Sequence, residues 1–288
     1  MKIRLIAMDM DGTLLDNDTT RLPAENAAAL REAAEAGIHI AICSGRNPDD
    51  ISMYALDAGL PQLHILALNG GCIMDRPMGT ILRSDCISPD TSLRLMRRAH
   101  ASGLLYGCFR DHVLAIDNGT PENQPVIRWG YHLLRPEGLG QMVFGAEAVE
   151  SMARQGFNKL VLLDMESTGV IPSLKKELES DFPELELCAS WTNNIEANPR
   201  GINKGSGLKN LADSLGIPME QVMAIGDHDN DLPMLRAAGV SVVMENGSPA
   251  ALATAHWMAP ANTRYGVADA IRFLALGDET LQGVKKLK

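Results

Sequence analysis

The chain has 288 residues with 26 basic and 36 acidic side chains, so that its formal net charge is −10, and 45% of its residues are hydrophobic. This composition is ordinary for a globular protein of one large domain or two modest ones, and it argues against extended disorder. The negative charge would repel a phosphate backbone, so we expect no nucleic-acid partner, although a local cation cluster could still attract a small anion.

The first third of the chain alternates between strand and helix patterns. Apolar runs at 3–8, 38–43 and 63–68 predict strands. The alanine-rich segment from Pro23 to Gly37 predicts a helix, because proline is favoured in the first turn and glycine just past the end. Strands and helices in this order are typical of a parallel sheet with crossover helices.

The middle of the chain follows a different pattern. A loop rich in glycine and proline is expected at 118–141. The expected helices are 88–102, 144–155 and 170–180, and the expected strands are 104–109, 113–117, 158–164 and 184–190. This mixture predicts a domain separate from the one that begins the chain.

The last third returns to the first pattern. It predicts a helix at 205–215, a strand at 222–225, a short helix at 231–237, a strand at 240–244 and a final helix at 266–276. The two ends of the chain therefore build one domain together.

These patterns predict an α/β fold with two domains. The core, a Rossmann-like parallel sheet with helices, is expected to consist of residues 1–83 and 198–288. An inserted α/β domain of residues 84–197 is expected to form the second unit.

The cysteines and the apolar runs indicate a cytoplasmic protein. Cysteines are scattered, odd in number and without a CxxC spacing, as reduced thiols would be: Cys43, Cys72, Cys86, Cys108 and Cys188. No apolar run reaches 18 residues, and the run after Met1 is too short for a signal peptide. We therefore expect no membrane partner, and the sequence leaves protein partners undetermined.

Polar residues gather where the apolar strands end. Four segments carry them: Asp9–Thr13, Ser44–Arg46, Asn203–Gly205 and Gly226–Asp231. Each segment alone fits an ordinary turn or a solvated charge. In an open parallel sheet, however, ligands bind beyond the carboxyl ends of the strands, so together the four segments predict one binding site.

The acidic residues of these segments predict a metal ion. Asp9, Asp11 and the acidic residues between Asp227 and Asp231 would place at least four carboxylates at one sheet end. Like charges so close together are destabilising unless a cation neutralises them. Ligands that are all oxygen atoms favour Mg²⁺ over zinc.

A calcium-binding EF-hand is the rival interpretation of the acidic loop. Asp227, Asp229 and Asp231 fall at positions 1, 3 and 5 of such a loop. Position 6 would be Leu232 instead of glycine, and position 12 would be Ala238 instead of glutamate. The sequence excludes this reading.

The remaining residues suit phosphoryl transfer, in which positioned donors and Mg²⁺ stabilise negative charge. Ser44 offers a hydroxyl, Gly45 an unhindered backbone N–H and Lys204 a point charge. Asp9 can attack phosphorus, and Asp11, two residues on, can protonate the leaving oxygen. Gly12 would permit the sharp turn that brings both carboxylates to one substrate.

At these residues the chain resembles the haloacid dehalogenase phosphatases over nearly its whole length. Asp9-Met10-Asp11-Gly12-Thr13-Leu14-Leu15 resembles their first motif, and Gly226-Asp227-x-x-Asn230-Asp231-x-x-Met234-Leu235 their fourth. Ser44 is similar to the second motif, with serine in place of the commoner threonine, and Lys204 to the third. His228-Asp229 makes the fourth loop bulkier and more acidic than is usual.

The position of the inserted domain refines the resemblance. Between Asp9 and Ser44 there is room for one helix and one strand, whereas more than half of the chain lies between Ser44 and Lys204. This arrangement is similar to the type IIB, or Cof-like, branch, whose cap is an α/β domain. It differs from the β-phosphoglucomutase-like branch, whose cap comes early.

The resemblance implies a role for each site residue. Asp9 would be the nucleophile and Asp11 the general acid and base. Phosphate would be bound by Ser44, Gly45 and Lys204, and Mg²⁺ by Asp9, the Asp11 backbone carbonyl and Asp227, with Asn230 and Asp231 in or behind the shell. Asp231 would also orient Lys204, and His228 is expected to face solvent.

The resemblance implies a magnesium-dependent phosphohydrolase with a phosphoaspartyl intermediate. Its substrate would be a small phosphorylated metabolite, a sugar phosphate above all. A phosphomutase and a non-catalytic sugar-phosphate sensor on the same fold stay open as alternatives, whereas a response-regulator receiver has less than half this length. In the insert, Trp191–Glu196 suits sugar recognition or a plain edge strand about equally well.

Overall fold

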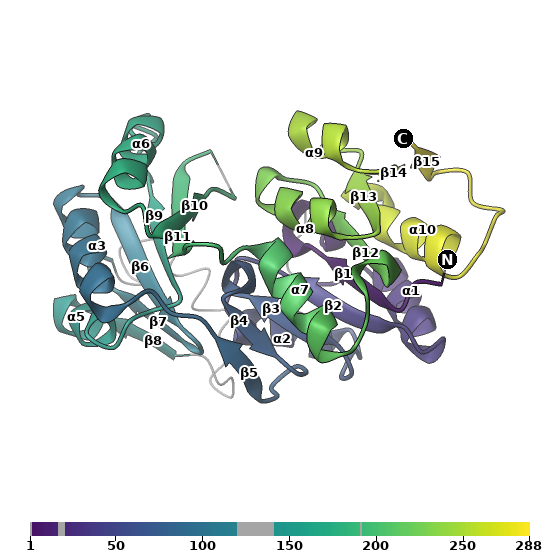
Figure 1. The fold of residues 1–288 in the computed structure, drawn as a ribbon, viewed down its shortest axis with the longest axis horizontal. Coiled ribbons are helices and arrows are strands. Elements are labelled where there is room, and N and C mark those ends of the chain that lie inside the picture. Colours follow the sequence, from purple (N-terminus) through teal and green to yellow (C-terminus); the bar gives the residue numbers. More distant parts are fainter. Residues whose placement is uncertain (1, 17–20, 120–140, 191) are drawn as a thin grey trace.

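The computed structural model describes residues 2–16, 21–119, 141–190 and 192–288. Two sheets divide these residues into two lobes, a core on the right of Figure 1 and a cap on the left. Most of the loop predicted at 118–141, and Trp191, lie outside the described residues. Within the described ranges, no helix combines the length and the apolar character that a membrane span needs.

The core sheet has nine strands, of which six neighbours in its middle run parallel. In spatial order they are β15 (Lys285–Lys286), β14 (Trp257–Ala259), β13 (Val240–Met244), β12 (Val222–Gly226), β1 (Leu5–Met8), β2 (His39–Cys43), β3 (His64–Ala67), β4 (Cys72–Met74) and β5 (Ile81–Ser84). The antiparallel strands β15, β4 and β5 lie at the two edges.

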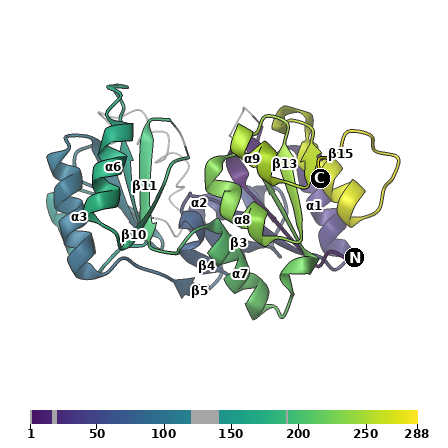
Figure 2. The ribbon, with the colours of Figure 1, turned by 45° about the horizontal axis from the view of Figure 1, so that its top comes forward.

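Helices cover both faces of the core sheet because alternate strand residues are apolar on both sides. They are α1 (Ala24–Glu35), α2 (Pro48–Asp57), α7 (Lys204–Ser214), α8 (Leu232–Ala237), α9 (Pro249–Thr254) and α10 (Gly266–Ala270). Ile6 and Met8 of β1 pack with α1, α2 and α10, whereas Leu5 and Ala7 pack with α7, α8 and α9. Figure 2 shows the second group of helices in front of the sheet.

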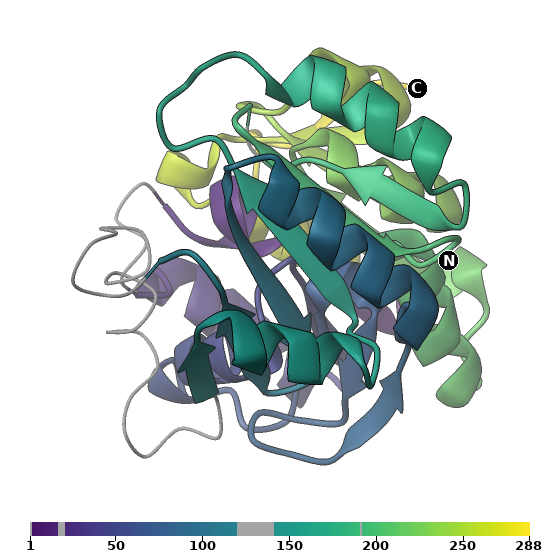
Figure 3. The same cartoon turned by 90° about the vertical axis from the view of Figure 1, so that its left-hand side faces the viewer.

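The cap sheet has six strands with helices on its outer face (Figure 3). Its order is β10 (Leu185–Cys188), β11 (Asn194–Pro199), β9 (Lys159–Leu163), β6 (Leu105–Arg110), β7 (Val113–Ile116) and β8 (Gln141–Phe144). The helices are α3 (Pro89–Ala101), α5 (Ala146–Ala153) and α6 (Ile171–Asp181). They bury a second hydrophobic core between themselves and the sheet.

Of the two interpretations left open for Trp191–Glu196, the plain edge strand is wrong. The stretch around Asn194–Glu196 is not an edge strand, because β11 lies between β10 and β9 and pairs with both. Ile195 and Glu196 are buried there, so the sequence pattern reflects an interior strand with an internal ionic partner.

The strands and helices expected from the sequence are all present, within a few residues at their ends. The sequence patterns did not predict α2, the β4–β5 hairpin, β8, α9 or the short strands β14 and β15. Short helical turns complete the chain at Met10–Leu14, Leu68–Gly70, Met219–Gln221, Asp229–Asp231, Asn262–Arg264 and Ile271–Ala275. The cap sheet begins after β5 ends at Ser84, and its last strand extends to Pro199.

Candidate active site

The predicted site residues meet at the carboxyl end of the core sheet. Asp9 follows β1, Ser44 follows β2 and Asp227 follows β12, and β1 pairs with both of the other strands. Lys204 is the first residue of α7, whose start is capped by Asn203. The parallel order of the strands is therefore what brings together residues far apart in the sequence.

Lys204 joins two of the carboxylates. Its Nζ lies 2.7 Å from Asp9 Oδ1 and 2.6 Å from Asp231 Oδ1. All three side chains are buried: Lys204 is 1% exposed, Asp9 5% and Asp231 0%. Although burial opposes it, the charges of Asp231 and Asp9 raise the pKa of Lys204, so the ammonium stays protonated.

Asp231 also shapes the loop that carries Asp227. Its Oδ2 accepts hydrogen bonds from the backbone N–H of Asp227 at 2.9 Å and of His228 at 3.0 Å. Both oxygens of Asp231 are thus committed, one to Lys204 and one to the loop.

Gly12 and Thr13 hold Asp227 from the other side. Thr13 Oγ1 donates to Asp227 Oδ1 at 2.6 Å. Gly12 has φ +77°, and a Cβ there would lie 2.5 Å from Asp227 Oδ2. Only glycine allows both this left-handed turn and the close approach.

The charges of the cluster fit a divalent cation. Ligand atoms of Asp9, Asp227 and Asp231 lie within 4.8 Å of one another, with Lys204 as the neighbouring cation. Burial and the charge of Asp231 raise the pKa of Asp9 well above its usual range, and the same two causes raise the pKa of Asp227 to about 6. A cation bound between Asp9 and Asp227 would favour the charged form of both carboxylates and so oppose both shifts.

Asn230 supports the same conclusion. It is 9% exposed, and its buried Oδ1 has no hydrogen-bond partner among the described residues. A buried carbonyl oxygen without a donor is costly and is an acceptor that a cation or a donor group could satisfy.

Ser44 and Gly45 form the loop after β2. Ser44 is 2% exposed, and its Oγ accepts a hydrogen bond from the backbone N–H of Arg46 at 3.2 Å. The Ser44 carbonyl accepts from the Asn69 N–H at 3.0 Å, so the neighbouring turn fixes this loop. Because the Ser44 oxygen accepts this hydrogen bond, the hydroxyl can donate its proton to another acceptor.

Asp11 stands apart from the cluster and has a partner that the sequence analysis gave no role. Arg46 donates from Nε to Asp11 Oδ2 at 2.8 Å and from Nη2 to Oδ1 at 2.5 Å. Arg46 also contacts Asp50 and Tyr54 at 3.2 and 3.3 Å. The sequence feature that could have revealed this partner is an arginine two residues after Ser44, the candidate phosphate-binding serine.

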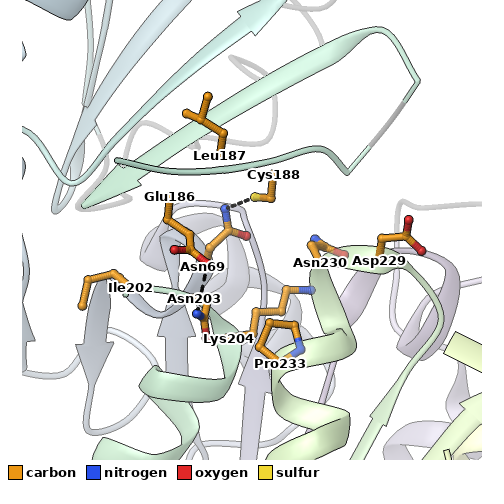
Figure 4. Close-up of a pocket in the computed structure, with 10 residues that line it drawn as sticks. All are labelled: Asn69, Glu186, Leu187, Cys188, Ile202, Asn203, Lys204, Asp229, Asn230 and Pro233. Carbon is orange, nitrogen blue, oxygen red and sulfur yellow. Dashed lines mark hydrogen bonds between the residues drawn. The ribbon is translucent and has the colours of Figure 1, made fainter. Parts of the chain in front are cut away.

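The cap contributes a pocket over this site (Figure 4). It has a volume of about 160 Å³, and Glu186 and Cys188 of β10 face Lys204 and Asn230 across it. Its full lining is Asn69, Glu186, Leu187, Cys188, Ile202, Asn203, Lys204, Asp229, Asn230 and Pro233. The pocket thus combines core and cap residues, as a site for a bound small molecule would.

The loop of the fourth motif, Gly226–Asp231, differs from the expectation at His228. His228 is partly buried rather than solvent-facing, because the turn at Asp229–Asp231 folds the loop back onto Asp231. Asp229 is exposed, and its Oδ1 accepts a hydrogen bond from Ser248 at 2.6 Å.

Comparisons with known proteins agree with this architecture. The model of a family described as haloacid dehalogenase-like hydrolase matches residues 6–271. The chain is 31% identical over 276 residues to the 5-amino-6-(5-phospho-D-ribitylamino)uracil phosphatase YcsE of Bacillus subtilis, covering 95% of this chain and 96% of that protein. It is 29% identical over 276 residues to the pyridoxal phosphate phosphatase YbhA of Escherichia coli, covering 94% and 98%.

A solved structure shares the fold. The subclass IIB sugar phosphatase BT4131 superposes with a TM-score of 0.78 at 19% sequence identity, over 95% of this chain and 99% of that one. At this identity the similarity establishes the arrangement of core and cap.

Proposed function

We propose that this chain, which belongs to the haloacid dehalogenase-like hydrolases and is a phosphatase acting on small phosphate substrates, depends on Mg²⁺ and transfers the phosphoryl group to Asp9. The observation that carries the proposal is the buried Lys204 ammonium between Asp9 and Asp231, with Asp227 within 4.8 Å of both carboxylates. Such a cluster can bind an anionic group only with further positive charge.

In the first half-reaction, a carboxylate oxygen of Asp9 attacks phosphorus. The bond from Asp9 to phosphorus forms as the bond to the leaving oxygen breaks, and the Asp11 carboxyl gives its proton to that oxygen. Lys204 and the Ser44 hydroxyl stabilise the charge on the other phosphoryl oxygens. Arg46, which binds both oxygens of Asp11, keeps that carboxyl group oriented.

In the second half-reaction, water attacks the phosphorus of the phosphoaspartyl group. Asp11, now a carboxylate, takes the proton of this water, and inorganic phosphate leaves with regeneration of the Asp9 carboxylate. Asp11 thus acts once as acid and once as base. Its partly exposed position, at 39% of the side chain, gives it access to water.

Asp9, Asp227 and the Asp11 backbone carbonyl would hold Mg²⁺, with Asn230 beside them and Asp231 behind. When bound, the ion supplies charge that offsets the carboxylates and the substrate phosphate. Gly12 and Thr13 keep Asp227 in place for this role.

For the substrate, we propose a phosphorylated sugar or sugar alcohol. The named substrates of the two relatives, a phosphoribitylamino-uracil and pyridoxal phosphate, are small phosphate monoesters. Selectivity would come from the cap, proposed as residues 84–197, which faces the phosphate site across the pocket. Glu186, which lines the pocket, offers carboxylate oxygens that can accept hydrogen bonds from hydroxyl groups.

Two measurements test the proposal. Hydrolysis of p-nitrophenyl phosphate should stop with EDTA, return with Mg²⁺ and be absent in Asp9→Asn, since an amide cannot form the acyl phosphate. A panel of phosphate esters ranked by kcat/KM should be headed by sugar or polyol phosphates. Activity in excess EDTA would refute the metal requirement, and nucleotides or phosphopeptides leading by tenfold would refute the substrate class.

A further inference from the structure

A buried lysine of the cap reaches the loop that follows β2. Lys159 begins β9 and is 3% exposed. Its ammonium donates to the Gly45 carbonyl at 2.5 Å and to Glu196 Oε2 at 3.0 Å, and lies 5.0 Å from the Phe109 ring centroid. A buried ammonium must keep its acceptors, so these contacts fix its position.

Glu196 of β11 is itself held on both oxygens. Oε1 accepts from Ser190 Oγ at 2.6 Å and from Asn194 Nδ2 at 3.1 Å. Oε2 accepts from Asn69 Nδ2 at 2.7 Å as well as from Lys159. Burial alone would raise the pKa of Glu196, but the Lys159 charge and these hydrogen bonds outweigh it and lower the pKa. Glu196 is therefore ionised and held rigidly in the cap sheet.

Gly45 lets this pair approach the core. A Cβ at Gly45 would lie 3.1 Å from Asn69 Oδ1 and from Glu196 Oε2, and 3.4 Å from Lys159 Nζ. Because Gly45 has no side chain, Lys159 and Glu196 can contact the loop that follows β2. This is a second role for the glycine, in addition to its unhindered N–H.

One peptide plane connects Lys159 to Ser44. In a trans peptide the C=O and the N–H point in opposite directions, so the direction of the Gly45 carbonyl sets that of the Arg46 N–H. That N–H donates to Ser44 Oγ at 3.2 Å. Because the serine oxygen accepts this bond, the serine proton is left to donate elsewhere.

We propose that Lys159 is a positioning residue, which fixes the Gly45–Arg46 peptide from the cap and thereby aims the Ser44 hydroxyl at the substrate phosphate. The inference rests on the proposed function, because it takes Ser44 as a phosphate ligand. The contact between Lys159 and Gly45 would make phosphate binding in the core depend on the position of the cap relative to the core.

The test measures the inhibition constant of inorganic phosphate against p-nitrophenyl phosphate. The variant is Lys159→Met/Glu196→Gln, which leaves no buried carboxylate without its cation. We expect the inhibition constant and KM to rise about tenfold, the factor of one charge-assisted hydrogen bond. Glu196→Gln alone keeps the bond from Lys159 to Gly45, so the inhibition constant should stay within about twofold of wild type, although the loss of the buried counter-charge should lower Tm.

Two further proteins separate positioning from a loss of structure. Asn158→Ala removes neighbouring cap–core hydrogen bonds, to Gly71, Ser84 and Asp85, and should lower Tm without raising the inhibition constant. In a Ser44→Ala background, the loss of Lys159 should change the inhibition constant less than about threefold, because the hydroxyl that Lys159 positions is absent.

The outcomes distinguish the two proposals. An active wild type in which the loss of Lys159 leaves the inhibition constant unchanged, or changes it equally with and without Ser44, would overturn the positioning role alone. A wild type that neither hydrolyses p-nitrophenyl phosphate nor binds phosphate would overturn the proposed function, and the inference with it.

Discussion

Removing one charge from the metal-free cluster should stabilise the fold. Asp227 is 9% exposed, and burial together with the charge of Asp231 raises its pKa to about 6. At pH 7 without a divalent ion, the folded protein must therefore carry an unfavourable buried charge. In Asp227→Asn this charge is absent, and the amide oxygen can still accept the hydrogen bond from Thr13.

The size and sign of this effect follow from the pKa difference. A folded pKa of about 6 against about 3.9 in the unfolded chain corresponds to about 3 kcal/mol. Because the folded pKa is the higher one, the folded state takes up the proton first as pH falls. Wild type should gain stability relative to Asp227→Asn between about pH 6 and pH 4, and the difference should be gone below that.

The assay is urea unfolding of both proteins in EDTA across this pH range, and again with Mg²⁺. Without metal, Asp227→Asn should be the more stable protein at pH 7. With Mg²⁺, the free energy of unfolding of wild type should rise, because ligand binding stabilises the folded state. Asp213→Asn, on an exposed pair with Lys209, should change little. If Asp227→Asn is no more stable than wild type at pH 7 in EDTA, the charge argument fails.

Three substitutions test the rest of the site. Arg46→Met should lower kcat/KM by roughly 10- to 100-fold, and more for alkyl than for nitrophenyl phosphates, because Asp11 loses the side chain that orients it. Gly12→Ala should raise the Mg²⁺ concentration for half-maximal activity about tenfold or more, since its Cβ would displace Asp227. Lys204→Met should lower kcat/KM by about 10³-fold, and urea unfolding in EDTA should show a loss of about 3–5 kcal/mol.

Each substitution has a matched control. Gly37→Ala meets a similar positive φ of +78° with nothing within 4 Å, so it should leave the Mg²⁺ requirement unchanged. Lys209→Met removes an exposed lysine of α7 and should leave kcat/KM unchanged. Arg46→Lys keeps the positive charge without the two-point contact to Asp11 and should restore part of the activity. An equal loss on alkyl and nitrophenyl phosphates would mean that Arg46 acts on structure rather than on Asp11.

The sequence was sufficient for the three strands that carry the site, because their signal is local. Each of β1, β2 and β12 is a short apolar run followed at once by polar residues, and parallel strands bring such ends together. The positions of Asp9, Ser44 and Asp227 at one edge of the sheet follow from that rule alone.

What the sequence could not reveal depends on pairings between distant segments. Asn69, Lys159 and Glu196 meet at Gly45, yet no local spacing joins a core turn to two strands of the cap. The partners of Glu196 also explain why the polar residues of this interior strand fitted an edge strand or a sugar-binding surface equally well in the sequence, since they satisfy one another inside the cap. The β4–β5 hairpin was missed because its strands are short and the segment between them contains proline and glycine.

The two strands that pair with β1, the central strand of the core, are synthesised at very different times. Leu5 pairs with His39 on one side and with Val222 on the other, and the whole cap lies between. At roughly 5–20 residues per second, β12 leaves the ribosome on the order of 10–40 s after β1. The cap, whose strands pair only among themselves, can fold during this interval, while the backbone N–H and C=O groups along one edge of β1 stay unpaired. A ribosome that stalls beyond the cap would therefore present a finished cap on an open, aggregation-prone half-sheet.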